Sequence, residues 1–138
     1  MSYAGDVDPS EAWKRLSENA EARLVDVRSQ AEWSFVGVPD LSGAGKRTLF
    51  LQWQVYPAMA QNQTFVDELA KAVPDKDTPL YFICRSGGRS RAAAMAMTAA
   101  GYRHCYNVAD GFEGGPDGSR HRGRIAGWKA AGLPWIQD

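Results

Sequence analysis

The chain has 138 residues, of which 44% are hydrophobic, so it is long and apolar enough to bury the core of one domain. Sixteen basic residues balance sixteen acidic ones, and this zero net charge gives no sign of a nucleic-acid partner. The amino-terminal residues do not resemble a signal peptide, and no apolar run reaches the roughly 20 residues needed to span a membrane. Because Cys84 and Cys105 are the only cysteines, a disulfide framework is excluded, and we expect a reducing, cytoplasmic environment.

The chain begins with a clear helix start. Asp8 can cap the helix, Pro9 suits the first helical position, and Glu11 can reach back in a capping-box arrangement. The apolar residues that follow share one helical face as far as Asn19. The sequence therefore predicts a helix from residue 9 to about residue 19.

The next elements are two short strands and a second helix. Residues 24–27 form a β-rich run between polar segments, which indicates a buried strand, and residues 48–51 are a second candidate. Between residues 62 and 73 the apolar side chains repeat with helical spacing. Pro74 ends this helix.

The second half of the chain contains the strongest strand signal. Residues 80–83 are four large apolar residues, and an alanine-rich helix over 89–100 follows, closed by Gly101. Residues 104–108 predict a further strand, and residues 128–132 a last helical turn.

Strands that alternate with helices in this way predict an α/β fold with a central, mostly parallel sheet of about five strands and helices on both faces. No linker or repeat divides the chain, so residues 1–138 are expected to form a single domain. Ligands of such sheets bind beyond the carboxyl ends of the strands. Cys84 follows the strongest strand directly and is expected at that edge.

The turn between this strand and the next helix carries the chemistry, and its residues are Cys84, Arg85, Ser86, Gly87, Gly88, Arg89 and Ser90. A cysteine at a helix amino terminus meets a partial positive charge, which favours the thiolate. The two glycines allow successive N–H groups to point inward as an anion-binding nest. Arg85, Arg89 and Arg91 add positive charge that attracts anions. A buried structural cysteine in a plain turn is the alternative, but such a turn has no use for these arginines.

Outside this loop, two further groups of residues have a recognisable pattern: Asp26-Val27-Arg28 followed by Glu32-Trp33, and Gly111-Phe112 with Trp128 and Gly132-Leu133-Pro134. Together with the loop they resemble the rhodanese family of sulfurtransferases. The resemblance implies a rhodanese-like domain in which Cys84 takes a sulfane sulfur from a donor, becomes a persulfide and passes the sulfur on. It implies no metal or other cofactor.

This chemistry suits the loop. The Cys84 thiolate would attack the outer sulfur of thiosulfate, sulfite would leave, and the nest with Arg89 would stabilise the charge, which predicts ping-pong kinetics. Arg85 favours an anionic donor, since relatives that use 3-mercaptopyruvate have glycine there. A thiophilic small molecule such as cyanide or a thiol is the expected acceptor, with a thiol-bearing protein as an alternative. Asp26 and Arg28 are expected to have a structural role, in an ion pair or as support for the loop, and Glu32 is a candidate partner of Arg28.

The sequence also departs from the family pattern. Residues 36–40 replace the usual glycine-histidine-isoleucine stretch, and an insertion rich in glycine and arginine occupies about residues 113–127. The basic run 120–124 within it reads as a solvated loop, with an anionic ligand as the alternative. Cys105 is expected to be a small buried packing residue, and one adjacent histidine does not make a zinc site.

Two other functions remain as rivals. A phosphatase or arsenate reductase of the same fold also uses a cysteine loop closed by arginine, but with five intervening residues, whereas only four separate Cys84 from Arg89. A non-catalytic module for protein docking is the other rival, and modules of that kind often lack the cysteine.

Overall fold

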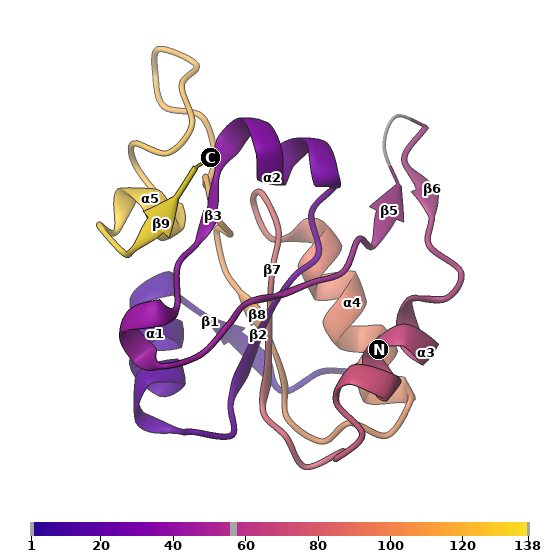
Figure 1. The fold of residues 1–138 in the computed structure, drawn as a ribbon. Helices are drawn as coiled ribbons and strands as arrows, with labels where there is room; N and C mark the ends of the chain where they lie inside the picture. The colour runs from indigo at the N-terminus through magenta and orange to yellow at the C-terminus, as the bar shows by residue number, and fades with distance from the viewer. Residues whose placement is uncertain (1, 56–57, 138) are drawn as a thin grey trace.

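The computed structural model describes residues 2–55 and 58–137, and a five-stranded sheet runs through it. Its strands lie in the order β1-β8-β7-β2-β4, and each pair of neighbours is parallel (Figure 1). The predicted parallel sheet of about five strands is confirmed. The strand bounds are Gly5–Val7 (β1), Arg23–Asp26 (β2), Leu49–Phe50 (β4), Leu80–Ile83 (β7) and Cys105–Val108 (β8).

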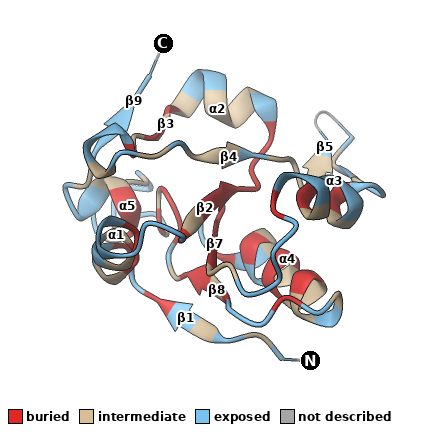
Figure 2. Ribbon diagram, turned by 60° about the horizontal axis from the view of Figure 1, so that its bottom comes forward, coloured by how far each residue is buried: buried red, intermediate tan, exposed pale blue. Residues whose placement is uncertain are grey.

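Helices cover both faces of the sheet, as expected (Figure 2). One face packs against α3 and α4 and includes Phe82, whereas the other packs against α1 and α5 and includes Ile83. Since β7 has a paired strand on each side and helices above and below, all four of its residues are buried, which explains its unbroken apolar run. The helix bounds are Pro9–Glu18 (α1), Phe65–Ala72 (α3), Gly88–Ala99 (α4) and Gly127–Ala130 (α5).

The predicted helix ends hold with small corrections. Asp8 caps α1 by accepting a hydrogen bond from the Glu11 N–H at 2.8 Å, and Asn19 is the C-cap of the helix. The Glu11 carboxylate, however, accepts from Arg15 one turn later and does not complete a capping box. The next predicted helix starts later than expected, because the Asn62 side chain accepts from the Thr64 N–H in a turn that precedes α3. Within the described ranges, no helix has the length and apolar content to cross a bilayer.

Several short elements were not predicted. Strands of two or three residues are too short to show a hydrophobic period, and they acquire their structure from their pairing partners. The helix α2 is also short, although Ser29 and Glu32 at its start have the spacing of a capping box. These elements are β1 at the sheet edge, α2 (Gln30–Val36), a 3₁₀ turn (Ser42–Ala44), and the antiparallel pairs β3 (Val38–Pro39) with β9 (Trp135–Ile136) and β5 (Gln54–Val55) with β6 (Ala60–Gln61).

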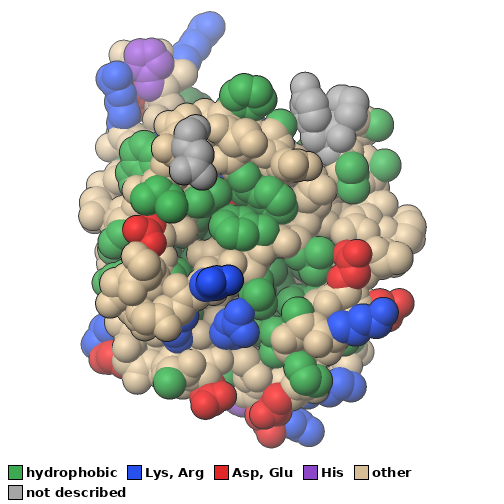
Figure 3. Space-filling model, viewed as in Figure 1, with side chains coloured by type: hydrophobic (Ala, Val, Ile, Leu, Met, Phe, Trp, Pro, Cys, Tyr) green, Lys and Arg blue, Asp and Glu red, His purple; other side chains and the backbone are tan. Residues whose placement is uncertain are grey.

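The segment 113–127 protrudes beside α5 and β9 as a series of turns (Figure 1). The Asp117 carboxylate organises it by accepting hydrogen bonds from the backbone N–H groups of Ser119 and His121. Arg120 and His121 are exposed, and basic side chains gather at the corresponding upper left of Figure 3. This exposure agrees with the predicted solvated loop, although Arg122 is half-buried and donates to the Gly114 carbonyl at 2.7 Å, and the alternative of an anionic ligand stays a prediction.

Candidate active site

Cys84 lies at the carboxyl end of β7, where the chain turns into α4. This is the sheet edge that the sequence predicted. Its carbonyl oxygen accepts a hydrogen bond from the Phe112 N–H at 2.8 Å, which ties the start of the loop to the segment after β8. Gly87, the N-cap of α4, has a φ of +112°, a backbone conformation that glycine adopts without steric cost. The turn can therefore close in four residues and aim the helix at the sulfur.

The Cys84 sulfur occupies the position of a helix-capping oxygen. Sγ accepts hydrogen bonds from the Gly87 N–H at 3.1 Å and the Ser90 N–H at 3.4 Å, and it lies 3.2 Å from Ser90 Oγ. Ser90 is the third helical residue, whose N–H a capping side chain ordinarily satisfies. Although Cys84 is only 2% exposed, its sulfur is not enclosed by apolar groups alone. The amide donors predicted from the glycines are present, and their partial positive charges are directed at the sulfur.

The arginines of the loop are arranged differently from the prediction. The Arg89 guanidinium donates two hydrogen bonds to the Glu32 carboxylate, at 2.7 and 2.9 Å, rather than contacting the sulfur. Arg85 and Arg91 are exposed. Among residues 2–55 and 58–137, no guanidinium nitrogen hydrogen-bonds to Cys84 Sγ. Backbone amides therefore contact the sulfur, while Arg89 anchors the loop and contributes charge from a distance. Of the other loop residues, Ser86 and Gly88 are exposed at the rim.

Glu32 is held in place by the first turn of α2. Ser29 caps this helix, and the Glu32 carboxylate accepts from the Ser29 N–H at 3.2 Å, which completes a capping box. Burial acts to raise the pKa of Glu32, but the hydrogen bonds and charge of Arg89, together with Ser29, lower it to about 2. The carboxylate is thus a stable anionic anchor for Arg89. Sequence reasoning identified Glu32 but assigned it to the wrong arginine.

Asp26 and Arg28 form an ion pair with no exposure to solvent. Arg28 Nη2 donates to Asp26 Oδ2 at 2.7 Å and to the Gly37 carbonyl at 2.8 Å. The guanidinium carbon lies 4.3 Å from the centre of the Phe112 ring, so the guanidinium stacks on an aromatic face. Its Nη1 group has no hydrogen-bond acceptor in the described part of the chain. Arg28 therefore pairs with Asp26 and not with Glu32, the partner that the sequence suggested.

The segment that follows β8 supports the cysteine loop from behind. The backbone N–H groups of Glu113 and Gly114 both donate to the Arg85 carbonyl, at 3.0 and 3.2 Å. Gly111 packs so closely that an added Cβ would lie 2.4 Å from the Cys84 carbonyl oxygen. The glycine noted in the sequence is therefore required by the approach of two backbones. Together with Phe112, this segment fixes the backbone of Cys84 and Arg85 from outside the loop.

A chain of polar side chains also leads away from the sulfur. Ser90 Oγ lies 2.5 Å from Asn107 Oδ1, and Asn107 Nδ2 donates to Asp6 Oδ1 at 3.0 Å. Sequence reasoning found neither Asn107 nor Asp6. The only available signal was a polar residue among the apolar residues of β8, and the contribution of β1 depends on a pairing between distant parts of the chain.

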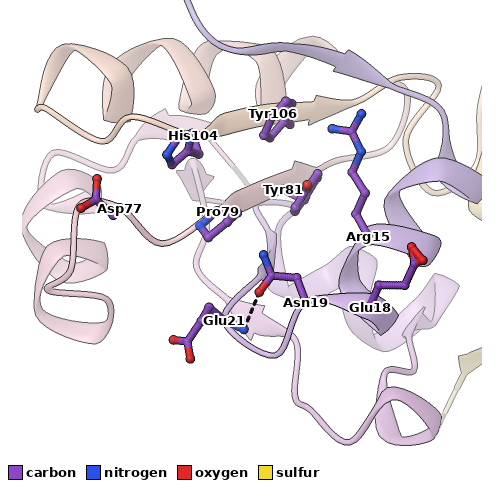
Figure 4. A pocket seen from close by; sticks show the side chains of 9 residues that line it. All are labelled: Arg15, Glu18, Asn19, Glu21, Asp77, Pro79, Tyr81, His104 and Tyr106. Atoms are coloured by element: carbon purple, nitrogen blue, oxygen red, sulfur yellow. Dashed lines mark hydrogen bonds between the residues drawn. The ribbon is translucent and has the colours of Figure 1, made fainter.

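The remaining candidates lie apart from this site. Cys105 is completely buried, and burial raises the pKa of its thiol to about 11, as expected for a packing residue. No group of metal-binding side chains was found in the described part of the chain. A pocket of about 550 Å³ lies at the opposite end of β7 and β8, where Tyr81 and Tyr106 stack and Arg15 and His104 contribute to the lining (Figure 4). Its lining includes no residue of the cysteine loop.

Comparison with known proteins identifies a family over nearly the whole chain. Residues 5–138 match the STR4 middle domain family. An uncharacterised protein of Rickettsia conorii is 41% identical over 127 residues, which cover 91% of this chain and 92% of that protein. The thiosulfate sulfurtransferase GlpE of Pseudomonas savastanoi is 30% identical over 105 residues, covering 76% of this chain and 81% of the enzyme.

Two solved structures share the fold of this chain. The crystal structure of Rv0390 from M. tuberculosis is 50% identical, covers 99% of this chain and 100% of its own, and superposes with a TM-score of 0.92. The rhodanese-like domain of the Anabaena protein Alr3790 is only 17% identical, but it covers 100% of this chain and 81% of its own with a TM-score of 0.64. That likeness shows a shared fold.

The Glu32–Arg89 pair predicts how stability depends on pH. Because the folded pKa of Glu32 is about 2, below its ordinary value of 4.5, the pair stabilises the fold fully above pH 4.5 and loses this effect as the pH falls toward 2. We expect this loss to amount to about 2–3 kcal/mol. In urea unfolding across this range, Glu32→Gln should be less stable than wild type at pH 7 and should lose less on acidification. If the unfolding free energy falls equally with pH in both proteins, the low pKa assigned to Glu32 is wrong. Glu18→Gln, at an exposed carboxylate, serves as the control.

The buried Asp26–Arg28 pair predicts a large loss of stability when one partner is removed. Asp26→Ala leaves the Arg28 charge buried without its carboxylate, which should cost about 3–5 kcal/mol. Glu11→Ala breaks the exposed pair with Arg15 and should cost about 0.5 kcal/mol or less. Urea unfolding at pH 7 measures the loss of unfolding free energy in both variants. Equal losses would show that burial does not make the Asp26–Arg28 pair more important for stability than the exposed pair.

Proposed function

Because the chain belongs to the STR4 middle domain family of rhodanese-like domains, we propose that it is a sulfurtransferase in which Cys84 carries a sulfane sulfur as a persulfide. The observation that supports this most directly is the pair of amide donors on Cys84 Sγ, from Gly87 and Ser90. A sulfur carrier needs a thiolate as nucleophile and again as leaving group. In both roles the Cys84 sulfur carries negative charge, and this is the atom that the Gly87 and Ser90 amides contact.

The proposed reaction with thiosulfate has two half-reactions. In the first, the Cys84 thiolate attacks the outer sulfur, the S–S bond of the donor breaks, and its electron pair leaves with sulfite. In the second, an acceptor such as cyanide or a thiol attacks the outer sulfur of the persulfide. The electron pair of that bond returns to Cys84 Sγ, where the Gly87 and Ser90 amides again stabilise the charge. The separate halves give ping-pong kinetics.

Arg85 is the best candidate for recognition of an anionic donor. Arg89 is engaged with Glu32, whereas Arg85 is exposed and directly follows the nucleophile. The similarity to a thiosulfate sulfurtransferase supports thiosulfate as the donor to test first. Both cysteines are free, which suits a reducing compartment, and we propose the cytoplasm. We keep a small molecule as the first acceptor, with a thiol-bearing partner protein as the alternative.

The engagement of Arg89 weakens the rival phosphatase function. A phosphatase of this kind needs its loop arginine to grip the phosphate, and two of the five N–H donors of Arg89 are already bound to Glu32. The loop between Cys84 and Arg89 also has only four residues. A docking module without catalysis would not require amides directed at a cysteine sulfur. The reaction assay below separates these three functions.

We expect thiosulfate to add the mass of one sulfur atom to the peptide containing Cys84, and cyanide to remove it as thiocyanate. Intact and peptide mass spectrometry follow the first step, and colorimetric thiocyanate detection follows the second. Cys84→Ala should lose both steps, whereas Cys105→Ala should retain them, because that thiol is buried and protonated. Equal turnover by wild type and Cys84→Ala would reject the proposal, and hydrolysis of an aryl phosphate with no sulfur loading would favour the phosphatase.

For donor recognition, we expect Arg85→Ala to raise the KM for thiosulfate about tenfold or more, with a smaller change in kcat, since a charge-assisted contact contributes about 1.5–3 kcal/mol. Arg85→Lys should restore most of the affinity. Arg103→Ala, at an exposed arginine paired with Asp77 away from the loop, is the matched control. An unchanged KM in Arg85→Ala would remove Arg85 from donor binding.

A further inference from the structure

A row of hydrogen-bonded polar side chains runs from Cys84 through Ser90 of α4 and Asn107 of β8 to Asp6 of β1, at the surface. Ser90 and Asn107 are 0% and 2% exposed, and Ser90 Oγ lies 2.5 Å from Asn107 Oδ1 and 3.2 Å from Cys84 Sγ. At the outer end, Asp6 Oδ1 accepts hydrogen bonds from Asn107 Nδ2 at 3.0 Å and from the Tyr3 hydroxyl at 2.8 Å. The parallel pairing of β1 with β8 places Asp6 beside Asn107. The sulfur is therefore connected to an exposed carboxylate.

The available protons determine the direction of each hydrogen bond. A carboxylate has acceptors only, so Asn107 must turn its NH₂ group toward Asp6 and its carbonyl oxygen toward Ser90. The serine hydroxyl has a single proton, and the short contact with Asn107 Oδ1 uses it. What Ser90 Oγ presents to Cys84 Sγ is then a lone pair.

We propose that Asp6 and Asn107 are positioning residues that orient the Ser90 hydroxyl so that it accepts a hydrogen bond from the Cys84 thiol. In this arrangement Ser90 stabilises the protonated sulfur, while the Gly87 and Ser90 amides stabilise the ionised one. Ionisation of the thiol requires the hydroxyl to rotate and donate to sulfur, which leaves Asn107 Oδ1 without its donor. The relevance to sulfur transfer rests on the proposed function, but the effect on thiol reactivity does not.

Other charges surround the loop, and the proposed variants leave them in place. These charged groups are not part of the hydrogen-bonded row from Ser90 to Asp6. A substitution within that row therefore separates its effect on Cys84 from the effect of the surrounding charges. The charged groups on the elements packed around Cys84 are Arg85, Arg89 and Arg91 in the loop and α4, Glu32 on α2, Asp26 and Arg28 at the end of β2, and Asp110 and Glu113 after β8.

The test measures the rate at which iodoacetamide alkylates Cys84 across a pH series, followed by mass spectrometry of the Cys84 peptide. In Asn107→Leu, the released Ser90 hydroxyl can donate to the thiolate, so alkylation should be about tenfold faster on the acidic side of the curve, as expected for one hydrogen bond to an ionised group. The alkaline plateau, where all the thiol is ionised, should match wild type. Asp6→Ala, at an exposed position, should shift the curve in the same direction, and Asp6→Asn, which keeps an acceptor oxygen, should remain near wild type.

A double-mutant cycle shows whether the effect passes through Ser90. In a Ser90→Ala background, Asn107→Leu should cause no further acceleration. Glu18→Ala, at an exposed carboxylate on α1, is the control and should leave the curve unchanged. The proposal is overturned if Asp6→Ala and Asn107→Leu both follow the wild-type curve, or if Asn107→Leu accelerates alkylation equally without the Ser90 hydroxyl. Failure of thiosulfate to load Cys84 would reject the proposed function alone, because alkylation requires no sulfur transfer.

Discussion

The site depends on one interaction, in which the Cys84 sulfur satisfies the free amides at the start of α4. A helix leaves its first N–H groups without partners, and here the Gly87 and Ser90 N–H groups find theirs in sulfur rather than oxygen. Strand β7 delivers the cysteine from the middle of the sheet, and the short turn brings α4 back onto it. The same contact therefore caps the helix and places the partial positive charge of the amides against the Cys84 sulfur. Stability and chemistry share this contact, so neither can be altered alone.

The rest of the site holds that contact in place from three directions. From α2, Glu32 fixes Arg89 in the first turn of α4. From the segment after β8, backbone N–H groups bind the carbonyls of Cys84 and Arg85. At the end of the neighbouring strand β2, Asp26 accepts hydrogen bonds from Arg28, and Arg28 also donates to the Gly37 carbonyl and stacks on the Phe112 ring. The loop is thus preorganised by its surroundings, which is how a site avoids the cost of reorganisation during reaction.

The parts of this arrangement that could be predicted from sequence are the local ones. The apolar run of β7, the Asp8 cap of α1 and the glycines after Cys84 each express their structure within a few residues, and the strand and the glycines placed Cys84 correctly between β7 and α4. The choice of ion-pair partner could not be predicted in this way. Glu32 follows Arg28 by four residues and looks like its partner, but Asp26 takes Arg28 inside the fold and leaves Glu32 to an arginine 57 residues away. The same holds for Asp6, whose neighbour in β8 is 101 residues along the chain.

A sulfur carrier has two requirements that oppose each other. A less basic thiolate leaves faster in the second half-reaction, but it is a weaker nucleophile in the first. Amide donors alone would make the thiolate less basic, which favours its departure and weakens its attack. The Ser90 hydroxyl can meet both requirements, because it is 3.2 Å from the sulfur and can either accept from a thiol or, after rotation, donate to a thiolate. With Asn107 as the competing acceptor at 2.5 Å, the donation to sulfur is weakened but not prevented. A hydrogen bond that can be redirected would suit the proposed function, in which the sulfur alternately attacks and departs.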